Sequence, residues 1–174
     1  MNRALRLALT TLLLPLAACV SEPPPPAPAP APPRLTPTQA LNAVLAVARA
    51  DDREVTIQPV RDPQVEDLRQ ASLDAQRRGD WKASADALNQ ALLITPDDPA
   101  VLQERAEVAL ALGEWERAET LARKALALGS RTGPLCRRHW ATIEQSQLAR
   151  GEDRNAISAH AQIANCTVAG FNRM

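Results

Sequence analysis

Apolar residues follow three different patterns along this chain of 174 residues. Residues 7–16 are mostly apolar and form one short block. Residues 23–37 contain nine prolines among fifteen positions, and half of the others are alanine. From residue 38 onward, apolar residues recur three and four positions apart, which is the spacing of an amphipathic helix. The pattern therefore predicts an all-α folded part that begins near residue 38 and is preceded by two segments of other kinds.

The first block has the features of a secretory signal over residues 1–18. Arg3 and Arg6 precede the apolar stretch, and small residues follow it. The stretch is too short to span a bilayer as a permanent helix, and Pro15 interrupts it. Residues 16–19 have the order Leu-Ala-Ala-Cys, which resembles the bacterial lipobox. We expect lipidation of Cys19 with acyl chains such as palmitate; the alternative is an ordinary signal with an incidental cysteine.

The proline-rich segment over residues 19–37 is expected to be a disordered tether. Such a composition cannot form a core and favours the extended polyproline II state. At about 3.1 Å per residue, residues 20–37 would reach on the order of 55 Å when fully stretched. The alternative is a spacer whose length has no importance. Val20 follows the lipidated cysteine where an aspartate would resemble an inner-membrane retention signal, so an outer-membrane location is favoured.

Residues 38–64 are expected to form a short helix and a loop. Thr36 is placed to cap the helix, Pro37 suits its first position, and Gln39 completes a capping box. Leu41, Val44, Leu45 and Ala48 recur at helical spacing through Ala50. Two prolines and few apolar residues predict a loop over residues 51–63.

Residues 65–170 contain an internal repeat with a period of 34 residues. Two glycine-x-tryptophan pairs, at Gly79 and Gly113, lie at this offset, and four further identities share it: Leu68 with Leu102, Ala75 with Ala109, Ala91 with Ala125, and Leu92 with Leu126. A helix-turn-helix unit of this length is the signature of the tetratricopeptide repeat. We expect repeats at 65–98 and 99–132, and a diverged third at 137–170 after four added residues in the segment 129–134.

Charge and composition argue against several classes of function. Without residues 1–18 the chain has 18 basic and 20 acidic side chains, so the electrostatic attraction that nucleic-acid binding depends on is missing. Three tryptophans, one phenylalanine and no tyrosine offer no platform for bases or sugars. We find no phosphate-binding loop and no nucleophile motif. The sequence therefore predicts no enzyme, no cofactor and no small-molecule substrate.

Cys136 and Cys166 are predicted to form a disulfide. They lie at the start of the first helix and the end of the second helix of the third repeat, and these ends are neighbours in a helical hairpin. An oxidising periplasm favours the bond. The alternative is a zinc site that adds His139 and His160. Hairpin geometry argues against it, because His160 is expected opposite Ile143 and not His139.

Resemblance to tetratricopeptide-repeat proteins also implies a binding face. In that family, the first helices of the repeats line a concave surface whose second, fifth, ninth and twelfth positions face the ligand. Carried over, these positions are Glu66, Arg69, Leu73 and Gln76 in the first repeat, Gln103, Glu107 and Leu110 in the second, and Arg138, Ala141, Gln145 and Leu148 in the third. The alternative for any of them is a solvated side chain with no partner.

The order of lipobox, tether, short helix and repeats resembles the tetratricopeptide-type outer-membrane lipoproteins that activate a bifunctional penicillin-binding protein. The resemblance implies a lipid-anchored protein that faces the periplasm, and whose repeats bind a penicillin-binding protein held in the inner membrane. The alternative is an adaptor or assembly factor for a periplasmic protease, a hydrolase or a secretin.

Overall fold

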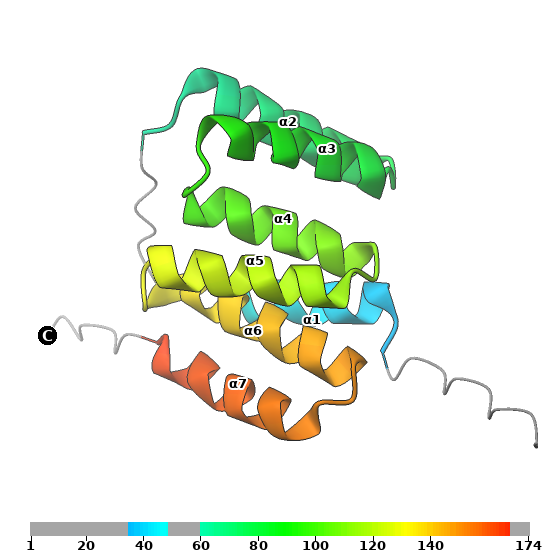
Figure 1. Cartoon of the computed structure of the whole chain (residues 1–174), viewed down its shortest axis with the longest axis vertical. Coiled ribbons are helices and arrows are strands. Elements are labelled where there is room, and N and C mark those ends of the chain that lie inside the picture. The colour runs from blue at the N-terminus through cyan, green and yellow to red at the C-terminus, as the bar shows by residue number, and fades with distance from the viewer. Residues whose placement is uncertain (1–34, 49–59, 168–174) are drawn as a thin grey trace, which may run out of the picture. The chain divides into compact units, whose positions relative to one another are not determined.

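Seven helices and no strand make up the part of the chain that the computed structural model describes, residues 35–48 and 60–167 (Figure 1). Helix α1 spans Pro37–Ala48. The others form three hairpins: α2 (Pro63–Arg77) with α3 (Trp81–Ile94), α4 (Pro99–Ala111) with α5 (Trp115–Leu128), and α6 (Gly133–Ala149) with α7 (Asp153–Asn165). The expected all-α architecture of about three repeats is confirmed. The predicted signal and nearly all of the predicted tether lie outside the described residues.

The turns inside the first two hairpins depend on glycine. Gly79 and Gly113 have φ angles of 74° and 73°, in the left-handed region that other residues adopt with strain. A glycine at this place ends one helix and lets the chain reverse into the next. The periodic glycines of the sequence therefore mark the hairpin turns.

Proline and aspartate define the helix starts. Pro63, Pro99 and Pro134 each occupy the first turn of a helix, where the missing N–H costs nothing. The side chain of Asp98 caps α4 by accepting hydrogen bonds from the backbone N–H groups of Ala100 and Val101, at 2.8 and 3.2 Å. Because its proline extends the first turn, α6 begins four residues before the predicted start of the third repeat.

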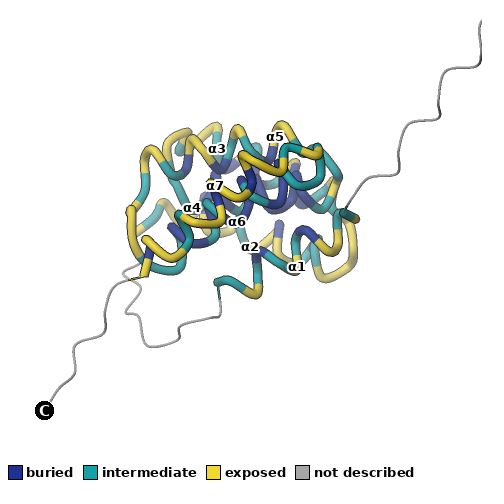
Figure 2. The backbone as a smooth tube through the Cα atoms, turned by 90° about the horizontal axis from the view of Figure 1, so that it is seen from below, coloured by how far each residue is buried: buried dark blue, intermediate teal, exposed yellow. Residues whose placement is uncertain are grey.

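The core between the hairpins is built from small residues. Ala85, Ala91, Ala106, Ala118, Ala122 and Ala125 are buried, and Leu88, Leu102, Leu110 and Ile143 supply the larger fully buried side chains. Small residues allow the helices to approach closely. Figure 2 shows the buried positions concentrated between the helices, with exposed positions along the outer sides of α3 and α5.

Helix α1 is not an isolated segment, because it packs against α4 and α6. The capping box expected at its start is present: the backbone N–H of Thr36 donates to Gln39 Oε1 at 3.0 Å, and the N–H of Gln39 donates to Thr36 Oγ1 at 3.3 Å. Ala40 and Val44 are its buried residues. The buried face thus includes Ala40, whereas Leu41 and Leu45 are only partly buried.

Candidate functional site

The predicted ligand-facing positions divide into two groups in the structure. Those of α2 reach the surface: Glu66 and Leu73 are exposed, and Arg69 and Gln76 are partly buried. Most of those of α4 and α6 are buried: Gln103, Glu107, Leu110, Ala141 and Gln145 are between 0 and 8% exposed, while Arg138 and Leu148 are partly buried. A partner can therefore reach the α2 positions directly, but not most of the others in this conformation.

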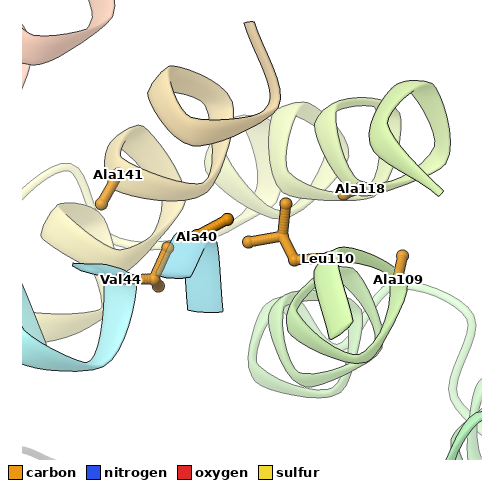
Figure 3. Close-up of a cluster of buried hydrophobic side chains, with 6 residues drawn as sticks. All are labelled: Ala40, Val44, Ala109, Leu110, Ala118 and Ala141. Atoms are coloured by element: carbon orange, nitrogen blue, oxygen red, sulfur yellow. The ribbon is translucent and has the colours of Figure 1, made fainter. Parts of the chain in front are cut away.

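Helix α1 accounts for part of this burial. Ala40 and Val44 share one apolar cluster with Leu110 of α4 and Ala141 of α6, and Val47 packs against the cluster. Figure 3 shows Ala40 and Val44 close to Leu110 and Ala141. Two positions at which a tetratricopeptide repeat is expected to meet its ligand thus meet a helix of the same chain.

A buried polar network accounts for much of the rest. Gln103 Nε2 donates to Thr142 Oγ1 at 2.7 Å and to Glu107 Oε1 at 2.9 Å. Gln103 Oε1 accepts from His139 Nδ1 at 2.7 Å, so the imidazole carries its proton on Nδ1. Burial, together with the nearby Arg138 charge, lowers the pKa of His139 to about 4. This histidine is therefore neutral at pH 7 and joins α6 to α4.

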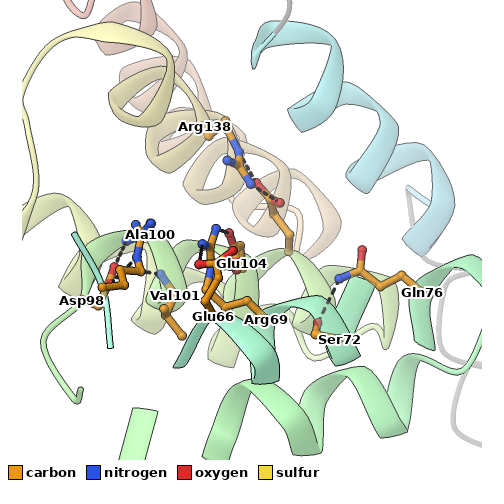
Figure 4. A network of polar contacts seen from close by, with 11 residues as sticks. Glu66, Arg69, Ser72, Gln76, Asp98, Ala100, Val101, Glu104 and Arg138 are labelled. Carbon is orange, nitrogen blue, oxygen red and sulfur yellow. Dashed lines mark hydrogen bonds and ion pairs between the residues drawn. The ribbon is translucent and has the colours of Figure 1, made fainter. Parts of the chain in front are cut away.

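Two ion pairs link the first helices of neighbouring hairpins (Figure 4). Arg69 of α2 binds both carboxylate oxygens of Glu104 in α4, with Nε at 2.9 Å from Oε2. Arg138 of α6 binds both oxygens of Glu107 in α4, at 2.7 and 2.6 Å. The predicted binding residues Arg69, Glu107 and Arg138 thus help to stack the repeats. Oppositely charged residues about one repeat apart, such as Arg69 and Glu104, were the sequence signal for this role.

The surface of α2 combines an apolar group with polar ones. Leu73 is 45% exposed. Glu66 pairs with Arg69 on one side of it, at 2.6 Å. Gln76 Nε2 donates to Ser72 Oγ and Ser84 Oγ, both at 3.2 Å. An exposed apolar side chain between fixed polar groups is the composition expected of a protein-binding surface.

An ion pair also fixes the segment that leads into α2. Arg61 Nε donates to Asp98 Oδ2 at 2.8 Å, and both side chains are largely buried. Burial alone would raise the pKa of Asp98, but Arg61 and the N–H groups at the start of α4 lower it below its ordinary value. The carboxylate of Asp98 therefore both caps the start of α4 and binds Arg61 in the segment that precedes α2.

Cys136 and Cys166 are joined by a disulfide with a Cα–Cα distance of 5.7 Å. The bond links the first turn of α6 to the end of α7. His139 and His160 do not share a site, because His160 Nδ1 lies 2.9 Å from Glu144 Oε1 on an exposed surface. In residues 35–48 and 60–167, no three metal-ligating side chains are grouped. No helix in these ranges has the length and apolar character that a membrane span requires. Cys19 lies outside them.

Comparison with known proteins gives a match in structure. No protein-family model matches the chain. No curated protein matches it either. The globular C-terminal domain of LpoP from P. aeruginosa matches with a TM-score of 0.56 and 29% sequence identity, over 60% of this chain and 99% of that domain. The matched share is about the length of the three hairpins. The helical hairpins and this match confirm the resemblance to the tetratricopeptide-type lipoproteins that the order of segments in the sequence predicted.

Proposed function

We propose that this chain is an outer-membrane lipoprotein whose repeat domain binds and activates a bifunctional penicillin-binding protein. The observation that carries the proposal is the match to almost the whole globular domain of LpoP at 29% identity. The lipobox at residues 16–19 and the proline-rich segment after it add the anchor and the reach that such a protein needs. The domain acts by binding, and it has no chemical step of its own.

Activation by binding requires that the partner exist in more than one conformation. A protein that binds the active conformation of a synthase better than the inactive one shifts the population toward activity. The lipid holds the repeats at the outer membrane, and the tether lets them meet a synthase in the inner membrane. Adaptor function for a protease, a hydrolase or a secretin would use the same anchor with a different partner.

We place the first contact with the synthase on α2. The predicted ligand-facing positions of α2 are Glu66, Arg69, Leu73 and Gln76, and this helix is the one on which two of them, Glu66 and Leu73, are exposed. Leu73 is the apolar group among them, and a few side chains near the centre of an interface contribute most of its binding energy.

The test compares two exposed leucines. Leu73→Asp should weaken binding to the penicillin-binding protein by about tenfold or more, which corresponds to roughly 1.4 kcal/mol. Leu93→Asp is the matched control, because Leu93 is 83% exposed on α3, the second helix of the same hairpin. Binding of the purified, solubilised synthase to the immobilised mature protein would be measured by biolayer interferometry.

An equal loss of synthase binding in both variants, or no loss in either, would contradict a synthase contact on α2. If the unmodified chain binds no penicillin-binding protein and captures a protease or secretin subunit instead, the adaptor function replaces the proposal.

A further inference from the structure

A groove follows α6 between α5 and α7. Both of these helices pack on α6, and side chains from all three line a pocket of about 440 Å³. A second pocket of about 220 Å³ shares Trp140 and Gln162 with the first. We call the two pockets together the α5–α7 groove. None of the predicted ligand-facing residues lines it, so it is a different surface from the predicted concave face.

The first pocket holds four charged residues whose charges cancel. Glu119 Oε1 accepts a hydrogen bond from Arg123 Nε at 2.8 Å, and Glu119 Oε2 pairs with Arg150. Arg150 Nε donates to Glu152 Oε1 at 2.8 Å. Burial would raise the pKa of Glu119, but hydrogen bonds from Arg150, Arg123 and Gln147 lower it below its ordinary value. The pocket therefore has no net charge, and an ionic ligand would have to break these pairs.

The wall of the same pocket contains two buried polar atoms that the protein leaves without a partner. Gln147 is 2% exposed, and its Nε2 donates to Glu119 Oε1 at 2.9 Å. Because an ionised carboxylate can only accept, this bond fixes the amide and leaves Gln147 Oε1 as a free acceptor. Within residues 35–48 and 60–167, neither Gln147 Oε1 nor Arg150 Nη1 has a hydrogen-bond partner. One acceptor and one donor are the complement of a secondary amide, which offers an N–H and a C=O.

The second pocket is more apolar. Its lining includes Leu126, Trp140 and both cysteines of the Cys136–Cys166 disulfide. Leu126 and Trp140 also pack against the buried cluster between α4, α5, α6 and α7, which holds them in place. Apolar walls that are already fixed favour an apolar group of the ligand at this end of the groove.

We propose that the α5–α7 groove binds an extended, uncharged peptide segment of a partner protein. A main-chain amide lies beside Gln147 and Arg150, and an apolar side chain lies between Leu126 and the disulfide. The α7 part of the lining, from Asn155 to Asn165, rises about 15 Å, which is the length of about five residues of extended chain. The apolar pocket next to the amide site favours a peptide over a glycan, which has no apolar side chain.

The probe is a phage-displayed library of random octapeptides, and the receptor is the mature full chain with Cys19→Ser. The library is first depleted on Ser158→Trp, because Ser158 lines the first pocket and is exposed, so a tryptophan there fills the groove. Ala161→Trp is the matched control: Ala161 is exposed on the same helix and lines neither pocket. Circular dichroism melting establishes that each variant is folded.

We expect the enriched peptides to be uncharged and to contain an apolar residue. Synthesised with a fluorescein label, they should bind Ser158→Trp at least about tenfold more weakly than the unmodified chain in fluorescence anisotropy, and Ala161→Trp equally well. Gln147→Met keeps the length of the side chain and removes its acceptor, so it should weaken binding by roughly threefold to tenfold. The proposal is overturned if no peptide survives depletion, or if Gln147→Met binds the peptides as tightly as the unmodified chain.

A competition experiment separates a peptide from a glycan. Chitotriose is an uncharged amino-sugar trimer whose N-acetyl groups also contain secondary amides. It should not displace the labelled peptide at concentrations at which the unlabelled peptide does. If chitotriose displaces the peptide at lower concentrations than the unlabelled peptide, the groove is a glycan site and the peptide proposal is wrong. The inference does not use the identity of the synthase, so its failure leaves the contact at Leu73 untouched, and a failure at Leu73 leaves this result standing.

Discussion

At the scale of single residues, a polar side chain on a first helix can face a ligand or can pack inside the fold. Its position in the sequence does not distinguish these two roles. Gln103 occupies a predicted ligand-facing position, yet it is fully buried and bonds to His139 and Thr142. Within residues 35–48 and 60–167, no acidic group compensates a positive charge on the ring of His139, and Arg138 beside it is already cationic. The imidazole therefore contributes to the fold as a neutral group.

The low pKa of His139 makes a prediction about acid stability. An unfolded histidine titrates near 6.5 and this one near 4, so the unfolded state binds more protons between these values. The contribution of His139 to stability is complete above about pH 6.5 and is lost as the pH falls to 4. The loss should reach about 3 kcal/mol.

Urea unfolding of the unmodified chain and of His139→Gln at pH 7.5, 5.5 and 4.5 measures this loss. Glutamine cannot be protonated, so the difference in unfolding free energy between the two proteins should shrink as the pH falls. Carboxylates such as Asp98 and Glu119, whose pKa values are lowered by arginine partners, titrate in both proteins and cancel. A difference that is independent of pH would contradict the neutral buried histidine.

The predicted ligand-facing positions show that the burial of a residue cannot be inferred from its place in a repeat alone. Position within a repeat predicts that a residue lies on the first helix and on its concave side. It does not predict whether the neighbouring hairpin or another helix covers the residue. Burial of Leu110 depends on α1, and the pairing of Glu107 depends on the stacking distance to α6. Both are tertiary properties that no local pattern contains.

At the scale of helices, the last hairpin differs from the other two. Its second helix, α7, is the last of the helices within residues 35–48 and 60–167, and its buried residues are Ala156 and Ala159. The disulfide fixes the end of this helix to the start of α6. The bond therefore supports a helix whose main neighbour is α6.

Removal of the disulfide should destabilise α7 more than the first hairpin. The chain-entropy account gives roughly 3 to 4 kcal/mol for a loop of this length. Hydrogen exchange of Cys136→Ser/Cys166→Ser, compared with the unmodified chain, should show lost protection in α7 and little change in α2 and α3. Equal loss in all three hairpins, or none in α7, would contradict a local role for the bond.

The helices were largely predictable because their signals are local. The glycine turns, the proline starts and the capping box of Thr36 and Gln39 each depend on a few adjacent residues. The place of α1 on α4 and α6 was not predictable, because its apolar stripe of alanine and valine fits many surfaces. The sequence also pointed to Leu41 and Leu45 as part of the apolar face, whereas the contact uses Ala40 and Val44 most completely.

At the scale of the whole molecule, α1 lies between the proline-rich segment and the repeats in the sequence. In the proposed function, the lipid on Cys19 anchors the chain and the tether determines how far the repeats reach. In the sequence, the same tether leads into α1, which packs on α4 and α6. In the same proposal, Leu73 of α2 meets the synthase.

The most direct test of this account is the rate of glycan polymerisation by a purified bifunctional penicillin-binding protein, measured while the mature protein is titrated. We expect the rate to rise and saturate with the unmodified chain and with Leu93→Asp, and to stay near its starting value with Leu73→Asp. A rate that none of the three proteins changes would contradict the central claim that this domain activates a peptidoglycan synthase.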